Sequence, residues 1–236
     1  MNKHSPNPEI IRNMFSKVAA NYDKANSVLS VGIHHLWRKN LVKYSGAKPG
    51  MKVLDCATGT GDLAIEFKKA VGNNGAVIGT DFCAEMLAPA PAKAAKKNLN
   101  IDFAQADVTN LQYPDKTFDI SSISFGIRNV GDPVKGISEM ARVTKSGGVV
   151  MVLEFGQMNA PVIGPLYNFY SEKVLPKIGG LVTGQKEAYE YLQKSSAAFP
   201  CREEFVELMK QTNAFSKIEY KSVSGGIAYI YKATVK

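Results

Sequence analysis

The residues best suited to chemistry are acidic, hydroxylated and small, and they gather at residues 53–63 (VLDCATGTGDL). This segment reads as a buried strand, then a glycine-rich turn, then the start of a helix. Gly59 and Gly61 allow the backbone to pass close to a ligand, which a Cβ atom would prevent. Asp55 ends the strand and Thr58 adds a hydroxyl to the turn. The segment predicts a small-molecule site at the end of a strand.

Further acids follow at the ends of the next two predicted strands. Asp81 lies about 20 residues beyond the turn, where an acid accepts hydrogen bonds from ribose hydroxyls. Asp107 and Val108 follow the third strand, where a carboxylate or a backbone amide would lie beside an adenine ring. Met86 and Ser124 complete the cofactor-binding residues that we predict.

The glycine turn favours S-adenosylmethionine (SAM) over a dinucleotide. Ala64 occupies the position of the third glycine of the dinucleotide motif. SAM has no pyrophosphate to be held at a helix N-terminus, whereas its amino-acid end requires polar groups near the turn. A dinucleotide site and a cofactor-free domain of the same fold are the alternatives.

These residues require an α/β framework to position them. Short β-branched runs alternate with helix-like stretches, which predicts a parallel sheet with crossover helices on both faces. The expected strands are 52–56, 76–81, 101–106, 118–123 and 148–154, and the expected helices between them are 63–71, 84–97 and 134–143. Residues 217–223 and 227–234, joined by Ser-Gly-Gly, predict an antiparallel hairpin. This is the seven-stranded, Rossmann-like layout of class I methyltransferases.

The rest of the chain adds helices to one domain, 1–236. We expect an N-terminal helical cap (1–47) with a break at 21–26, the SAM-binding core (48–156), a helical insert or lid (157–200), and a C-terminal helix and hairpin (201–236). Helices are expected over 163–198 and 202–212.

Composition narrows the class of protein. Hydrophobic residues make up 45% of the 236, as in globular proteins. No apolar run approaches the roughly 18–20 residues that cross a bilayer, and residues 1–10 lack the core of a secretory signal. We therefore expect a cytoplasmic protein. The three cysteines fit neither a disulfide framework nor a metal-ligand pattern, so no metal is expected.

The charge balance is basic, at +8. An excess of this kind attracts nucleic acid or an anionic membrane, unless the lysines simply form a solvated face. The basic residues are spread thinly, with no block beyond 93–97, so nucleic-acid binding is not favoured.

Several motifs in order resemble the C-methyltransferases of ubiquinone and menaquinone biosynthesis. Residues 22–30 (YDKANSVLS), followed by His34 and by Trp37 with Arg38, are similar to that family's first signature, with Ala25 in a methionine position. Residues 124–129 (SFGIRN) look like its F-G-x-R-N motif. Residues 142–154 look like its second signature but depart from it at Thr144, Ser146 and, just beyond, Gly156. The departures fall on a turn and a strand edge. They leave intact the glycine-rich turn within residues 53–63, the cofactor turn. The resemblance covers nearly the whole chain.

The resemblance implies methyl transfer from SAM to a ring carbon of a polyprenyl hydroquinol. Among the residues suited to that reaction, Arg128 would stabilise the quinolate. Asp62 would act as base, directly or through a water, or else it complements the helix dipole. Tyr22 and His34 would orient the ring oxygens, although His34 also suits packing beside Trp37. Asn129 would be a second donor or a turn residue.

The polyprenyl tail would explain an apolar stripe within residues 163–181. Its members are Leu166, Tyr167, Phe169, Tyr170, Val174, Leu175 and Ile178. The stripe either packs on the core or forms a groove that receives the isoprenoid at a membrane surface. Methylation of another small molecule or RNA, and SAM binding without catalysis, are the competing functions. The sequence leaves open which quinone is made and whether the chain forms a homodimer.

Overall fold

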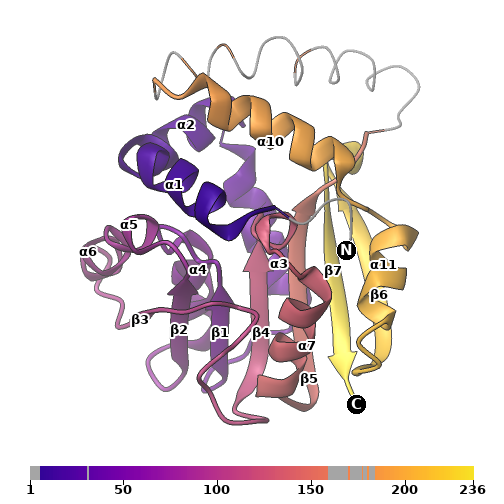
Figure 1. Ribbon diagram of the computed structural model, residues 1–236. Coiled ribbons are helices and arrows are strands. Elements are labelled where there is room, and N and C mark those ends of the chain that lie inside the picture. Colours follow the sequence, from indigo (N-terminus) through magenta and orange to yellow (C-terminus); the bar gives the residue numbers. More distant parts are fainter. Residues whose placement is uncertain (1–5, 31, 159–169, 171–176, 178–179, 181–183) are drawn as a thin grey trace.

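The computed structural model describes residues 6–30, 32–158, 170, 177, 180 and 184–236 (Figure 1). In this part of the chain, one sheet has seven strands in the order β3-β2-β1-β4-β5-β7-β6. The strands are β1 (Lys52–Cys56), β2 (Ala76–Asp81), β3 (Asp102–Gln105), β4 (Phe118–Ser124), β5 (Thr144–Phe155), β6 (Phe215–Val223) and β7 (Ala228–Val235). The five strands from β3 to β5 are parallel, and β7 is antiparallel to both of its neighbours. The predicted parallel sheet and terminal hairpin are confirmed.

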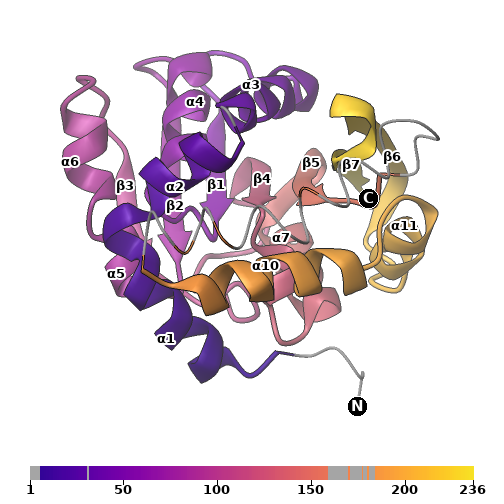
Figure 2. The same cartoon turned by 90° about the horizontal axis from the view of Figure 1, so that it is seen from above.

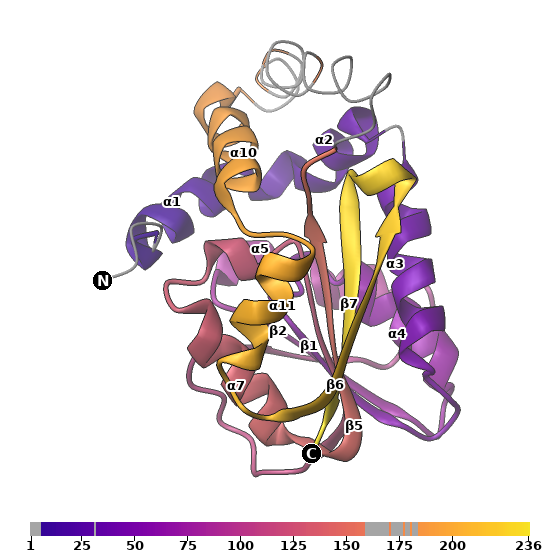
Figure 3. The same ribbon diagram turned by 90° about the vertical axis from the view of Figure 1, so that its right-hand side faces the viewer.

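Helices cover both faces of the sheet, as Figure 3 shows. One face carries α3 (Ile33–Ser45) and α4 (Asp62–Val71), and the other carries α7 (Pro133–Val143) and α11 (Glu203–Lys210). The shorter helices α5 (Ala84–Leu87) and α6 (Ala90–Ala95) lie beside β3. Because both faces are covered, the central strands are buried without alternation, and Val53 and Leu54 of β1 are both fully buried.

A cap lies over the carboxyl ends of the parallel strands. It consists of α1 (Pro8–Val18), α2 (Tyr22–Leu29) and α10 (Lys186–Ala198), which stand above that edge in Figure 1 and lie across it in Figure 2. Ala25 and Leu29 of α2 pack against Tyr189 of α10. The cap therefore covers the edge of the sheet at which doubly wound folds bind their ligands.

Three expectations about helices need correction or comment. The break expected at 21–26 lies earlier: α1 ends at Val18, a 3-10 helix, η1 (Ala19–Asn21), follows, and α2 runs through 22–26, where Ala25 is buried. A second turn follows Leu29, at Gly32, whose φ of +75° suits glycine. The single helix expected at 84–97 is two, α5 and α6, and Pro89 is the N-cap of the second. Apart from Tyr170, the apolar stripe of 166–178 lies outside the described residues.

Within the described ranges, no helix is both long and apolar enough to span a bilayer.

Candidate active site

The turn after β1 begins at a buried carboxylate. Asp55 is 1% exposed, and the hydroxyls of Thr58 and Ser122 donate to its two oxygens at 2.6 and 2.7 Å. Ser122 reaches it because β1 and β4 are paired with these two residues in register. Burial raises the pKa of Asp55 to about 6, although the two hydroxyl donors lower it. The predicted pair of Asp55 and Thr58 thus comes together at the turn.

The raised pKa of Asp55 predicts a pH-dependent gain in stability from Asp55→Asn. The folded protein holds the proton up to about pH 6, whereas the unfolded chain releases it near pH 4. The free energy of unfolding of the wild type should therefore fall, relative to the variant, as the pH rises from about 4 to about 6. A shift of this size corresponds to about 3 kcal/mol. Denaturant melts at pH 4 and pH 7.5 check this: the variant should gain stability only at the higher pH, and equal differences at both would contradict it.

Asp81 at the end of β2 holds the same turn from the other side. Its two oxygens accept from the backbone amides of Gly59 and Cys83, at 2.8 and 2.9 Å. Burial raises the pKa of Asp81, against the effect of these donors. Each carboxylate oxygen retains a further lone pair, so Asp81 can accept from a ligand hydroxyl as well.

The two predicted glycines serve different purposes. Both have positive φ, +56° at Gly59 and +85° at Gly61. A Cβ on Gly61 would meet Ala90 and the Phe103 ring at 3.1–3.2 Å, so this glycine is required by packing. A Cβ on Gly59 would lie 3.3 Å from the Met86 side chain, so Met86 lies beside the turn.

The remaining predicted cofactor residues differ in their surroundings. Asp107 follows β3 and is exposed, and its Oδ1 accepts from the amide and hydroxyl of Thr109. Val108 is buried in the core. Ser124 ends β4, and its buried Oγ has no hydrogen-bond partner among the described residues.

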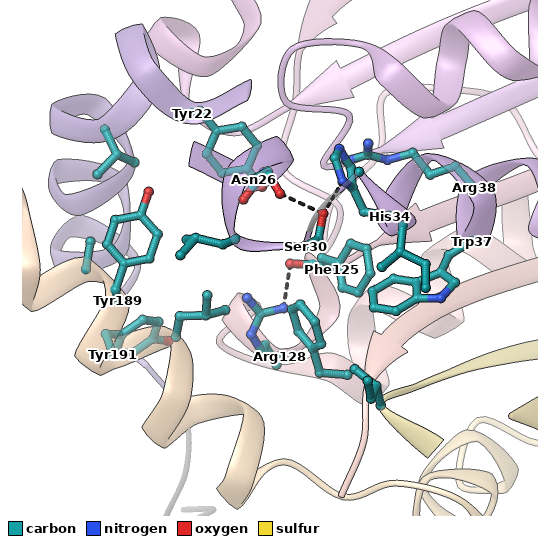
Figure 4. Close-up of a pocket in the computed structure, with 18 of the residues that line it drawn as sticks. Tyr22, Asn26, Ser30, His34, Trp37, Arg38, Phe125, Arg128, Tyr189 and Tyr191 are labelled. Carbon is teal, nitrogen blue, oxygen red and sulfur yellow. Dashed lines mark hydrogen bonds between the residues drawn. The ribbon is translucent and has the colours of Figure 1, made fainter. Parts of the chain in front are cut away.

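A cavity of about 780 Å³ lies between the cap and the carboxyl edge of the sheet. Its wall is mostly apolar, with polar side chains from α2, α3, α10 and the loop after β4. Figure 4 shows the labelled ones around the same space: Tyr22, Asn26, Ser30, His34, Trp37, Arg38, Phe125, Arg128, Tyr189 and Tyr191. The volume suits a ligand of drug size.

The loop after β4 packs on the turn after β1 and carries Arg128. Phe125 has a φ of +56°, and Arg128 lies in a short 3-10 helix, η2 (Ile127–Asn129). A Cβ on Gly126 would lie 2.6 Å from the Cβ of Ala57, so glycine is what lets this loop pack on the turn after β1. The same loop thus adjoins the cofactor turn and lines the cavity.

Arg128 is buried and its charge is paired. Its Nη1 donates to Glu154 at 2.7 Å and to the Phe125 carbonyl oxygen at 2.8 Å, and its guanidinium lies 5.3 Å from the centre of the Phe155 ring. Its buried Nε has no partner in the described ranges. The sequence pattern predicts no site role for Glu154. The only signal was an acid at the end of an otherwise apolar strand.

Two further predicted residues line the cavity, Tyr22 and His34. His34 is buried, and its Nδ1 is hydrogen-bonded to the Ser30 hydroxyl. Burial and the nearby charge of Arg38 lower the pKa of His34 to about 4. His34 is therefore neutral at pH 7 and has one ring nitrogen that accepts a proton or a hydrogen bond.

Asp62 and Asn129 do not line the cavity. Asp62 pairs with Arg38 at 2.8 Å and also with Lys93. Burial raises the pKa of Asp62, but these two cations outweigh it, so the pKa lies below its usual range. A carboxylate held in this way is a weak base. The Asn129 side chain accepts from Tyr191, which does line the cavity.

His34, His35 and Asp62 are close enough together to be considered as metal ligands. Asp62 is already neutralised by Arg38 and Lys93. The positive charge of these neighbours opposes a cation, so the arrangement does not favour a metal.

Comparison with known proteins gives concordant results. Residues 3–235 match the model of the ubiE/COQ5 methyltransferase family. A protein of Bdellovibrio bacteriovorus described as "Ubiquinone/menaquinone biosynthesis C-methyltransferase UbiE" is 77% identical over 236 residues, all of both chains. One of the same description from a Shewanella species is 39% identical, covering 95% of this chain and 90% of its own. A SAM-dependent methyltransferase of Aquifex aeolicus has a similar fold, with a TM-score of 0.66, 20% identity, and coverage of 91% of this chain and 98% of that one.

Proposed function

This chain belongs to the ubiE/COQ5 methyltransferase family, and on that premise we propose that it methylates a ring carbon of a polyprenyl hydroquinol in menaquinone or ubiquinone biosynthesis. SAM is the methyl donor, as for methyltransferases of this family and fold. The observation that supports a polyprenyl quinol as the substrate is the cavity. Its wall is mostly apolar, the loop at Gly126 joins it to the cofactor turn, and the buried Arg128 lines it.

The reaction requires a more nucleophilic ring than a neutral quinol provides. A phenol has a pKa of roughly 10, and loss of its proton pushes electron density onto the adjacent carbon. That carbon forms a bond to the methyl group as the bond from methyl to sulfur breaks, and S-adenosylhomocysteine leaves. Loss of the ring proton then restores the aromatic ring as a quinolate, and return of a proton to its oxygen gives the methylated quinol.

We assign Arg128 to stabilising the quinolate oxygen, through the Nε that lacks a partner among the described residues. Glu154 fixes the orientation of the guanidinium. Tyr22 and neutral His34 orient the ring oxygens from the opposite wall. Asp62, whose carboxylate is shared by two cations, serves in this proposal as their charge partner, and Asn129 orients Tyr191.

On the cofactor side, Asp55, Thr58 and Gly59 would hold the amino-acid end of SAM. Asp81 would accept from the ribose hydroxyls, and Met86, Asp107 and Val108 would surround the adenine. The supporting geometry is the convergence of Asp55 and Asp81 on one turn.

Purified protein supplied with SAM and either demethylmenaquinol or the methoxybenzoquinol precursor tests the proposal. Mass spectrometry should show a gain of one methyl group on the quinone ring, and the faster substrate identifies the pathway. No methylation of either substrate, with SAM bound, would contradict it.

We further propose that the protein works at the cytoplasmic face of the membrane, where a polyprenyl quinol resides. Ile33 and Leu36 of α3 line the cavity and yet are 37% and 55% exposed. Apolar side chains at a cavity mouth suit insertion into a lipid surface.

Sedimentation with anionic liposomes at low salt checks this placement. The wild type should sediment, and Leu36→Asp should reduce the bound fraction several-fold, because a charge cannot enter the apolar region cheaply. Asn100→Asp, an exposed change away from the cavity that adds the same negative charge, is the control and should bind as the wild type does. A wild type that stays in the supernatant would contradict the placement.

A further inference from the structure

Helix α2 presents two different faces to two parts of the site. Tyr22, Asn26 and Leu29 recur at helical spacing and line the large cavity. Asp23 and Ser27, one residue further on, line a separate cleft of about 240 Å³. A shift or rotation of this short helix therefore changes both surroundings together.

Asp23 ties α2 to the glycine turn. The Thr60 hydroxyl donates to its Oδ1 at 2.6 Å, and the ammonium of Lys93 donates to its Oδ2 at 2.6 Å. Thr60 is 4% exposed and lies between Gly59 and Gly61. Its neighbour Gly59 is the residue whose amide donates to Asp81. The path from Asp81, the carboxylate that we propose binds the ribose, to Asp23 of α2 therefore passes through Gly59 and Thr60.

The ionic contacts continue past Asp23 to the cavity wall. Lys93 also pairs with Asp62, and Asp62 pairs with Arg38. Arg38 lines the cavity and, by its charge, contributes to keeping His34 neutral. The chain of contacts starts on α2, passes through α6 and α4, and ends on α3 in the cavity wall.

We propose that Asp23 is a positioning residue that couples binding of SAM to binding of the quinol; this rests on the proposed function. SAM held by Gly59 and Asp81 fixes the turn. Thr60 and Asp23 then fix α2, and with it Tyr22 and Asn26 in the cavity. Coupling of binding is reciprocal, so the quinol tightens SAM by the same factor.

The experiment measures the Kd of S-adenosylhomocysteine by calorimetry, with and without saturating short-tailed demethylmenaquinol. In the wild type we expect the quinol to lower this Kd by about fivefold or more, the usual scale of coupling between sites. In Asp23→Ala the ratio should fall close to one, while each ligand still binds alone. Asp23→Asn, which keeps an acceptor for Thr60, should retain part of the coupling.

Two comparisons separate coupling from a structural effect. Thr60→Val removes the other partner of the same hydrogen bond, so it should lower the ratio as Asp23→Ala does, and the double variant should lower it no further. Glu207→Ala removes a carboxylate from an exposed ion pair on α11 and should keep the wild-type ratio.

An unchanged ratio in Asp23→Ala or Thr60→Val would overturn the proposal, as would a wild type in which the quinol leaves the Kd unchanged. Both results are compatible with methylation of the quinol by the wild type. Failure of the coupling is therefore distinguishable from failure of the proposed function.

Discussion

Arg128→Ala is expected to lower kcat by about 10²-fold or more while leaving the Kd for SAM nearly unchanged. The size is that of losing one preorganised donor to a developing oxyanion. Arg128 lines the cavity. Its Nε, which we propose donates to the quinolate oxygen, lacks a partner among the described residues. The hydrogen bonds of Asp55 and Asp81, which we propose hold SAM, do not involve Arg128. Steady-state kinetics and SAM calorimetry on the same preparation check both parts.

Because Arg128 is paired with Glu154, the Arg128→Ala variant requires a control for lost stability. Removing Arg128 alone leaves a buried carboxylate unpaired, which typically destabilises by about 3–5 kcal/mol. Arg128→Met combined with Glu154→Gln removes both charges at similar volume. If the arginine acts on the substrate, this stable double variant should be as slow as Arg128→Ala. An equal loss of SAM affinity in either variant would remove Arg128 from the substrate role.

Asp81→Ala should chiefly weaken SAM binding, by about 10²-fold. The change removes an acceptor for the ribose hydroxyls, and hydrogen bonds to a charged group contribute about 1.5–3 kcal/mol each. It also releases the Gly59 amide, which Asp81 holds at 2.8 Å. Calorimetry with SAM measures the loss.

Asp81→Asn separates the loss of the ribose contact from the loss of the Gly59 contact. Its amide oxygen can still accept from the Gly59 backbone, but the charge is absent, so we expect an intermediate Kd. The kcat at saturating SAM should change little in both variants, because the reacting carbon is remote from the ribose. Retained SAM affinity in Asp81→Ala would refute the ribose assignment.

The sequence predicted the sheet well because local patterns determine it. β1 and β2 have the predicted bounds, and Ser-Gly-Gly between β6 and β7 marked the hairpin. Predictions failed where distant packing decides. The asparagines at 21 and 26 suggest a break over the whole of 21–26, and Asn21 does end a 3-10 turn, but 22–26 is helical because Ala25 is buried against α10, some 160 residues away in the chain.

The candidate site was predicted as a set of residues but not as a set of contacts. The pattern identified Asp55, Thr58 and Asp81, which do converge. It could not show that Glu154 pairs with Arg128, since strand residues reveal no partner until the neighbouring loop is placed. Nor could it show Lys93 beside Asp62, because Lys93 looked like part of a solvated basic run. That contact places Asp62 in an ion pair and lowers its pKa, so we propose that it acts as a charge partner and not as the base.

The central claim is that SAM lies between Asp55 and Asp81 and presents its methyl group to the cavity that contains Arg128. A crystal structure with bound SAM tests this most directly. We predict the ribose hydroxyls within hydrogen-bond distance of Asp81 and the sulfonium methyl pointing past Gly126 toward the quinol cavity. A SAM molecule bound elsewhere, or one whose methyl group faces away from the loop after β4, would contradict the account.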